Sequence, residues 1–251
     1  MTGKVWIVGA GPGDPGLITV RGLEALRTAD VVLHDRLVAP ELLAACPPDA
    51  RRVDVGKAPG RRSVAQGEIA GMLVADARAG RRVVRLKGGD PYLFGHGGEE
   101  ALALAEAGVD FEVVPGVTSA LAVPAAAGIP LTCRGLASSV ALVTGRRAAD
   151  GDLPWEHLAA IDTVVVLMGA ARLHHVCARL LEAGRDPGTP AAAVRWGTTD
   201  RQREVFAPLR ELPEAFAGAG LGPPAVIVVG DVVGLGPRIR GSSLASVGGC
   251  P

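Results

Sequence analysis

The amino-acid sequence predicts an α/β protein of two domains, each with a sheet of roughly five strands. Short apolar, β-branched runs alternate with longer helical stretches along the 251 residues, and such alternation is typical of a mostly parallel sheet covered by helices. Ten strand candidates would be unusual in one open sheet. We therefore expect two halves with a hinge near residues 115–128, where Pro115 and Gly116 interrupt the pattern.

The first half, placed at residues 1–116, contains five strand candidates separated by helical stretches. The strands are expected at residues 5–8, 31–34, 52–55, 83–86 and 111–114. Apolar residues at helical spacing predict helices over residues 17–29 and 99–107. A third helix is expected to open at Ser63, because Gln66 follows at the spacing of a capping box.

The second half, placed at residues 117–235, continues the alternation. Its strands are expected at residues 140–144, 163–167, 191–194, 204–206 and 225–229. A helical stretch at residues 118–129 contains Pro124, which should bend or interrupt it. Another helix is expected at residues 173–183. Residues 236–251 are rich in Gly and Ser and are expected to form a flexible tail.

The composition argues against several classes of protein. Lys and Arg together number 26, as do Asp and Glu, and a net charge of zero argues against a nucleic-acid-binding partner. The aromatic content of 3% argues against base-stacking platforms. No stretch approaches the roughly 18 consecutive apolar residues of a membrane-spanning helix, and no secretory signal is visible. We therefore expect a cytoplasmic protein without a membrane partner.

Metal sites and disulfides are also not expected. The four cysteines include no C-x-x-C pair, so a zinc ribbon is improbable, and reduced thiols fit a cytoplasmic protein. His157, His174 and His175 show no ligand spacing with other histidines, cysteines or carboxylates.

The first glycine-rich loop, residues 8–16, lies between a predicted strand and a predicted helix. A dinucleotide fingerprint would need a third glycine where Asp14 stands. Pro12 and Pro15 also remove backbone donors that a phosphate would use. The loop suits close approach by a ligand without phosphates, although a plain turn also accounts for its spacing. A nicotinamide dehydrogenase, suggested by the first two glycines alone, fits poorly.

A second glycine loop follows the predicted strand at residues 83–86. Ligands of open α/β sheets lie beyond the carboxyl ends of strands. Gly88 and Gly89 would let a ligand lie against the backbone, and Asp90 could accept hydrogen bonds from a ribose or an ammonium group. An ordinary turn is the alternative for this loop. His96 comes shortly afterwards, at or just before the first turn of a predicted helix.

Together these motifs are specific, and the sequence closely resembles the uroporphyrinogen-III C-methyltransferases of the tetrapyrrole methyltransferase family. The resemblance runs from about residue 4 to residue 233 and nearly covers the chain. It is carried by residues 8–15 (VGAGPGDP), 33–38 (LHDRLV), 55–57 (VGK), 83–100 (VVRLKGGDPYLFGHGGEE), 113–119 (VVPGVTS), 128–135 (GIPLTCRG), 168–169 (MG) and 196–198 (WGT). Related corrin-ring methyltransferases share the glycine loops but resemble the middle segments less.

The resemblance implies the tetrapyrrole methylase fold, with S-adenosylmethionine in the cleft between two α/β domains, and a homodimer. The implied reaction moves two methyl groups to carbons 2 and 7 of uroporphyrinogen III. Its products would be precorrin-2, a precursor in sirohaem and cobalamin biosynthesis, and S-adenosylhomocysteine. A later methyltransferase of the corrin pathway is the alternative, and a non-catalytic tetrapyrrole- or nucleotide-binding module is a further one.

Carried over position by position, the resemblance also implies site residues. The cofactor contacts would be Pro12, Gly88, Gly89, Asp90, Leu93, Thr118, Ser119, Met168, Gly197, Ala225 and Ile227. Asp35 and Lys57 would be catalytic, and His96, Glu99 and Arg134 would contact the substrate.

The chemistry fits these roles. A methyl group on a sulfonium is already activated, so positioning is the main task and can supply about 7–11 kcal/mol of the barrier. The methylated ring must then lose a proton, and Asp35, at the end of a predicted strand, is the candidate base. Lys57 could donate a proton or bind a carboxylate. A turn residue and a solvated surface lysine are the alternatives for these two positions.

The acetate and propionate arms of the substrate favour arginine, which binds carboxylates in bidentate fashion. Arg134 is the first candidate, and weaker ones are Arg36, Arg61, Arg62 and Arg85. Two positions depart from the family pattern. Many relatives have Arg at the position of His96, and they tend to have His at that of Cys133, so both departures concern substrate handling.

Overall fold

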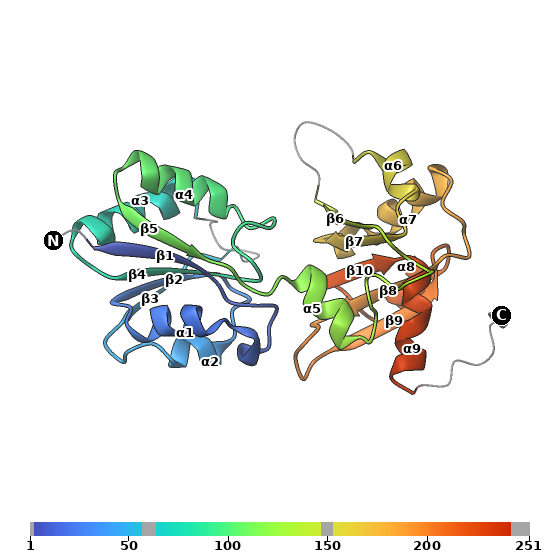
Figure 1. Cartoon of the computed structure of the whole chain (residues 1–251), viewed down its shortest axis with the longest axis horizontal. Helices are drawn as coiled ribbons and strands as arrows, with labels where there is room; N and C mark the ends of the chain where they lie inside the picture. Colours follow the sequence, from blue (N-terminus) through green and yellow to red (C-terminus); the bar gives the residue numbers. More distant parts are fainter. Residues whose placement is uncertain (1–2, 57–63, 147–152, 242–251) are drawn as a thin grey trace. The chain divides into compact units, whose positions relative to one another are not determined.

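The computed structural model describes residues 3–56, 64–146 and 153–241 and divides the chain into two compact units, Met1–Thr118 and Ser119–Pro251. Each unit contains one five-stranded sheet with helices packed on it (Figure 1). The expected pair of α/β domains with about five strands each is therefore confirmed.

The first unit has an entirely parallel sheet in the order β3-β2-β4-β1-β5. Its elements are β1 (Lys4–Gly9), the 3-10 helix η1 (Pro15–Leu17), α1 (Val20–Arg27), β2 (Val31–His34), α2 (Pro40–Ala44), β3 (Arg51–Asp54), α3 (Gln66–Arg78), β4 (Val83–Lys87), α4 (Gly97–Glu106) and β5 (Asp110–Val114). One core cluster packs α1 and α2 on one face, and another packs α3 and α4 on the other. β4 is thus the central strand of a doubly covered sheet.

The second unit differs from the expected mostly parallel sheet. Its elements are α5 (Ser119–Ala126), β6 (Val140–Thr144), α6 (Trp155–Ala159), β7 (Thr163–Leu167), η2 (Ala170–Arg172), α7 (Leu173–Glu182), β8 (Pro190–Arg195), β9 (Arg203–Pro208), α8 (Leu212–Gly218), β10 (Ala225–Val229), η3 (Asp231–Gly234) and α9 (Leu235–Ile239). In the order β6-β7-β10-β8-β9, only β6 and β7 pair in parallel. The turn at residues 196–202 is too short for a crossover helix, so β8 and β9 form an antiparallel hairpin.

Several local expectations need correction. The third helix begins at Gln66, not at Ser63, which lies outside the described residues; the Glu68 carboxylate accepts the Ala65 N–H at 2.9 Å instead. The helix expected at residues 17–29 is a 3-10 turn followed by α1, with Thr19 capping it. Pro124 lies inside α5, which ends two residues later at Ala126.

Residues 236–241, placed in the expected flexible tail, have a defined structure. Leu235–Ile239 form α9, and Gly236 and Pro237 in it are buried. Arg240 then forms an ion pair with Glu204 of β9. Apolar burial and this ion pair order a segment whose composition alone predicts flexibility. Among the described residues, no helix is long and apolar enough to cross a membrane.

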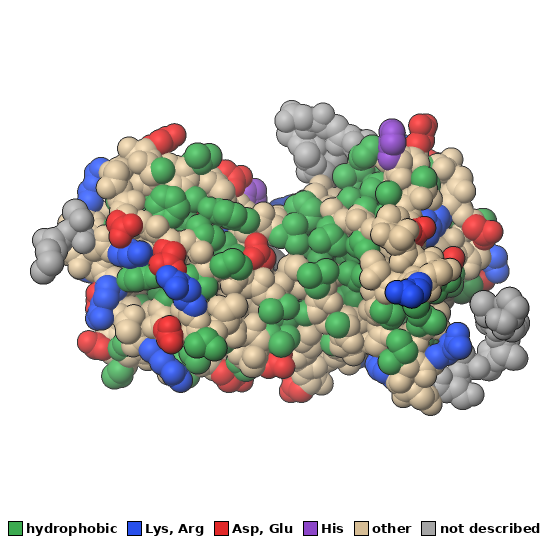
Figure 2. Space-filling view, viewed as in Figure 1, with side chains coloured by type: hydrophobic (Ala, Val, Ile, Leu, Met, Phe, Trp, Pro, Cys, Tyr) green, Lys and Arg blue, Asp and Glu red, His purple; other side chains and the backbone are tan. Residues whose placement is uncertain are grey.

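Opposite charges lie beside each other on the face of the first unit drawn in Figure 2. Lys4 lies 3.4 Å from Glu112, and Arg82 lies 2.8 Å from Asp30. Pairs of this kind contribute little to stability, because solvent and salt screen their charges. The stability of the unit therefore depends mainly on its two apolar core clusters.

The buried cysteines lead to a testable prediction. Burial raises the pKa of the Cys46 thiol, and raises that of Cys177 to about 12. Because the thiolate is the reactive form, both should resist iodoacetamide in the native protein, whereas the half-exposed Cys133 should react. Peptide mapping by mass spectrometry before and after denaturation checks this. Labelling of native Cys177 as fast as that of Cys133 would contradict the packing.

Candidate active site

The carboxyl ends of β1, β2 and β4 meet at one edge of the first sheet. The chain leaving β1 enters α1 on one face, and the chain leaving β4 enters α4 on the opposite face (Figure 1). Ligands of open α/β sheets bind where the connections diverge in this way. Both glycine loops and Asp35 follow these strands, so the structure brings together the motifs predicted in this half of the chain.

The two glycine loops are hydrogen-bonded to each other. Gly11 and Gly89 form an antiparallel bridge, with N···O distances of 2.7 and 3.3 Å. A Cβ atom on Gly9 would lie 2.6 Å from the carbonyl oxygen of Gly89, and one on Gly116 would overlap the same oxygen. Glycine is therefore needed here because backbone packs directly against backbone.

Two acidic side chains stabilise these loops by accepting hydrogen bonds from backbone N–H groups. The Asp90 carboxylate accepts the N–H of Tyr92 at 2.8 Å and that of Gly116 at 3.1 Å. Asp14 accepts the N–H of Gly16 at 2.7 Å and so caps η1. Each Asp90 oxygen retains a second lone pair. The structure shows that Asp90 stabilises its own loop. That Asp90 also contacts a ligand stays a prediction.

Gly88 leaves an open space in the second loop. Apart from its two chain neighbours, no described residue has an atom within 4 Å of the position where its Cβ would stand, and its φ is not in the left-handed region. Neither backbone crowding nor strain therefore explains a glycine at this position. A ligand lying against the loop would explain it.

Asp35 is held directly beside Gly88. Its backbone N–H donates to the carbonyl of Leu86, extending the ladder between β2 and β4 by one residue. Its Oδ2 accepts the N–H of Gly88 at 3.3 Å, and its Oδ1 accepts Nη2 of Arg85 at 2.5 Å. The side chain is still 33% exposed, so an oxygen lone pair can reach a ligand.

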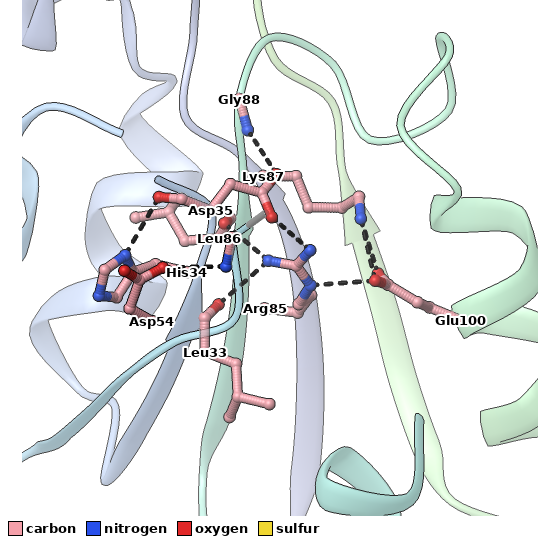
Figure 3. A network of polar contacts seen from close by, with 10 residues as sticks. Leu33, His34, Asp35, Asp54, Arg85, Leu86, Lys87, Gly88 and Glu100 are labelled. Carbon is pink, nitrogen blue, oxygen red and sulfur yellow. Dashed lines mark hydrogen bonds and ion pairs between the residues drawn. The ribbon is translucent and has the colours of Figure 1, made fainter. Parts of the chain in front are cut away.

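Below Asp35 lies a buried network of charged side chains (Figure 3). Arg85 and Lys87 point to the same face of β4, because side chains alternate along a strand. Arg85 Nε donates to Oε1 of Glu100 on α4 at 3.0 Å, and Lys87 Nζ contacts both Glu100 oxygens at 3.0 Å. All three side chains are at most 3% exposed. Burial, and then the nearby charge of Arg85, lower the pKa of Lys87.

The network corrects one prediction. Arg85 was a weaker candidate for a substrate carboxylate, but its guanidinium is buried and already bound to Asp35, Glu100 and the carbonyl of Leu86. The sequence did not suggest Lys87 or Glu100 as functional. Two cations at alternate positions of an otherwise apolar strand were the available signal, because such charges are almost never buried without partners.

His96 and Glu99 form a separate exposed pair at the start of α4. His96 stands at the N-cap with a left-handed φ of 59°, and its Nδ1 lies 3.0 Å from Oε1 of Glu99. The hydrogen bond from His96 is the main reason why the pKa of Glu99 is lowered. Leu93 is half-buried just before them. Both predicted substrate residues are accessible to a large anionic ligand.

The other basic candidates are less informative. Lys57, Arg61 and Arg62 lie outside the described residues. Arg36 is exposed beside Asp35. Arg134, in the second unit, is exposed in the turn closed by the Cys133–Ala137 bridge.

The remaining cofactor candidates differ in how accessible they are. Pro12 and Thr118 in the first unit and Ser119 and Ala225 in the second are half-buried, and Met168 is exposed. Gly197 packs its backbone against Val123 of α5, where a Cβ would overlap. Ile227 is fully buried in the central strand of the second sheet, so its side chain presents no surface to a ligand. That assignment depends on the resemblance alone.

Backbone strain concentrates in the predicted site segments. Among the described residues, those other than glycine with a left-handed φ are Phe94, His96, Met168, Trp196 and Thr198. Each is a predicted site residue or adjoins one, namely Leu93 or Gly197. Such conformations cost about 1–3 kcal/mol each and cluster at ligand sites. The strain therefore supports these loops as binding elements, independently of their sequence.

Comparison with known proteins agrees with this geometry. A family model described as Tetrapyrrole (Corrin/Porphyrin) Methylases matches residues 4–213. The chain is 47% identical over 234 residues to a uroporphyrinogen-III C-methyltransferase of Bacillus subtilis, covering 92% of this chain and 91% of the relative. It is 52% identical over 240 residues to a siroheme synthase of Chromobacterium violaceum, covering 94% of this chain but 51% of that protein. The chain thus spans about half the length of the siroheme synthases that it matches.

Solved structures give the same grouping. A uroporphyrin-III C-methyl transferase from Thermus thermophilus, complexed with S-adenyl homocysteine, matches with a TM-score of 0.81 and 45% identity over 93% of this chain and 100% of that one. A cobalt precorrin-4 methyltransferase matches with a TM-score of 0.83 and 33% identity over 92% and 95%. On these matches and on the loops described above, the chain belongs to the tetrapyrrole (corrin/porphyrin) methylase family.

Proposed function

We propose that this chain transfers methyl groups from S-adenosylmethionine to carbons 2 and 7 of uroporphyrinogen III, giving precorrin-2. The observation that carries the proposal is Asp35 held beside the open backbone of Gly88, in a member of this family. The relatives support the substrate, since one is named for this reaction and others for siroheme synthesis. Sirohaem synthesis is therefore the favoured destination of the product, with cobalamin synthesis as a second one.

The first unit suits a cofactor that has no phosphate. Its second loop offers open backbone at Gly88 and is stabilised by Asp90 and by the bridge between Gly11 and Gly89. Carboxylates at Asp14 and Asp90 would repel a pyrophosphate but tolerate a sulfonium. When bound, S-adenosylmethionine supplies a methyl carbon attached to a positively charged sulfur.

The residues of this chain then position the reactants and handle a proton. The ring carbon forms a bond to the methyl carbon, while the carbon–sulfur bond breaks and its electron pair stays on sulfur. The methylated ring loses a proton, for which the exposed lone pairs of Asp35 are the candidate acceptor. Arg134, His96 and Glu99 are proposed to contact the substrate, and Lys57 is proposed as a second catalytic residue that donates a proton or binds a substrate carboxylate.

The remaining assignments follow the family resemblance. Pro12, Leu93, Thr118, Ser119, Met168, Gly197, Ala225 and Ile227 are proposed to complete the cofactor contacts. We further propose a cytoplasmic homodimer, which light scattering of the purified protein would test.

A later corrin-pathway methyltransferase is the second candidate function. It is favoured by the match to a cobalt precorrin-4 methyltransferase, at 33% identity. The higher identity to a uroporphyrinogen-III C-methyltransferase, 47%, favours the first proposal.

Incubation with S-adenosylmethionine and reduced uroporphyrinogen III should yield a product heavier by two methyl groups, measured by mass spectrometry. A parallel reaction with precorrin-2 separates the two candidates. Rapid methylation of precorrin-2 and none of uroporphyrinogen III would favour the later enzyme, and no transfer to either substrate would reject both.

Gly88→Ala tests the cofactor cradle. Beyond its chain neighbours, the new methyl group meets no atom of the described residues within 4 Å, so folding stability should be nearly unchanged. If the loop holds the cofactor, affinity for S-adenosylhomocysteine should fall at least about tenfold, or about 1.4 kcal/mol, by calorimetry. Gly71→Ala on α3 is the matched control, since its Cβ also meets nothing within 4 Å. Equal affinities for both variants would count against the cradle.

Asp35→Asn tests the base. The amide oxygen can still accept from Arg85 or Gly88, but the side chain can no longer take a proton. Turnover should fall by about 100-fold or more, while S-adenosylhomocysteine binding stays within about threefold. Asp35→Ala should likewise lower turnover while leaving S-adenosylhomocysteine binding nearly unchanged. Asp30→Asn, just before the amino end of the same strand, is the control and should keep its turnover. Full activity of Asp35→Asn would remove Asp35 from proton transfer.

A further inference from the structure

The buried network below Asp35 has no part in the reaction as described so far. It contains two cations, Arg85 and Lys87, and one buried carboxylate, Glu100. Asp35 supplies the second carboxylate and is the only member that solvent reaches to a large extent. Burying such a cluster costs desolvation energy, and apolar residues of similar size often stabilise a fold as well or better. Its place in the central strand, directly under Asp35, therefore suggests a purpose other than stability.

Arg85 connects the two carboxylates through different atoms of one rigid group. Its Nε donates to Glu100, Nη1 donates to the carbonyl of Leu86 at 3.1 Å, and Nη2 donates to Asp35. A guanidinium is planar, so fixing Nε and Nη1 also fixes the direction of Nη2. The position of Glu100 is thereby transmitted to Asp35.

Glu100 is itself held from the other side. Lys87 contacts both of its oxygens at 3.0 Å. At the exposed end, the second oxygen of Asp35 accepts the N–H of Gly88. The Asp35 carboxylate is thus fixed at both oxygens, and one of these two supports depends on the buried network.

We propose that Glu100 is a positioning residue that acts on Asp35 through Arg85, with Lys87 holding Glu100 in place. This inference rests on the proposed function, because it assigns Asp35 a part in turnover. Glu100 contacts neither reactant. Its effect is to keep the Asp35 lone pairs directed outward at a fixed place beside Gly88.

The chain offers a matched control for a purely structural role. Asp76 on α3 is also nearly buried and bound by two cations, Arg51 at 2.5 Å and Arg81 at 2.7 Å. Arg51 begins β3 and Arg81 precedes β4, so this cluster lies at the amino ends of the strands, away from Asp35. Glu100→Gln and Asp76→Asn make the same change, from carboxylate to amide, at two nearly buried carboxylates, although the cations around Asp76 are themselves more exposed.

The experiment measures melting temperature, affinity for S-adenosylhomocysteine, and kcat and KM with uroporphyrinogen III for both variants. Both should melt below the wild type. Only Glu100→Gln should lose kcat, by about 10–100-fold, with affinity for S-adenosylhomocysteine within about threefold. Arg85→Lys keeps the charge but not the rigid fork, so it should lose kcat in the same way. If Glu100→Gln does not fold, Arg85→Lys serves as the test variant.

A kcat for Glu100→Gln equal to that of Asp76→Asn would overturn the proposal. Crystal structures of the wild type and Glu100→Gln give a readout that needs no substrate. The Arg85 Nη2–Asp35 Oδ1 contact, 2.5 Å here, should be lost or displaced in the variant, and an unchanged contact would also overturn the proposal. If the wild type does not methylate uroporphyrinogen III, the proposed function fails, while this structural comparison still decides whether Glu100 positions Asp35.

Discussion

The ion pair between Arg85 and Asp35 is the interaction on which the rest of the proposed site depends. It joins a side chain of the central strand to the first residue after the neighbouring strand. The buried end of Arg85 is neutralised by Glu100, and the exposed end of Asp35 receives the N–H of Gly88. The candidate base, the open loop at Gly88 and the buried counter-charge are therefore one connected unit. Any change in the strand register between β2 and β4 would separate Asp35 from both Arg85 and Gly88.

The glycine loops add a second constraint, which is steric. The backbones of Gly9, Gly89 and Gly116 approach so closely that no side chain fits on Gly9 or Gly116, and this contact joins the ends of β1, β4 and β5. Gly88 differs, because space is open beside it. One set of glycines thus builds the loops, while the other leaves room for a ligand. The sequence motif alone does not show which glycines are needed for backbone packing and which leave space for a ligand.

This difference shows how far the sequence alone could go. The alternation of short apolar runs with helical stretches locates the ten strands of the described residues, most of which are rich in valine. It does not give strand direction in the second sheet, since direction depends on the short turn after β8. The predicted site residues after β2 and β4 do come together, because the carboxyl ends of parallel strands share one edge. The sequence did not single out Glu100, because its role depends on a contact with Lys87, thirteen positions earlier. Sequence spacing alone does not specify that contact.

The strained residues of the second unit support their own loops as ligand-binding elements by a separate argument. Loop residues in a left-handed conformation at Met168, Trp196 and Thr198 cost energy that nothing in local propensity repays. The second unit can hold them because its sheet is filled with fully buried valine and alanine around Ile227. A rigid apolar core below strained loops is the arrangement that fixes a ligand with little reorganisation on binding. Ile227 lies inside this core, so its proposed part in cofactor binding would act through the loops that the core supports.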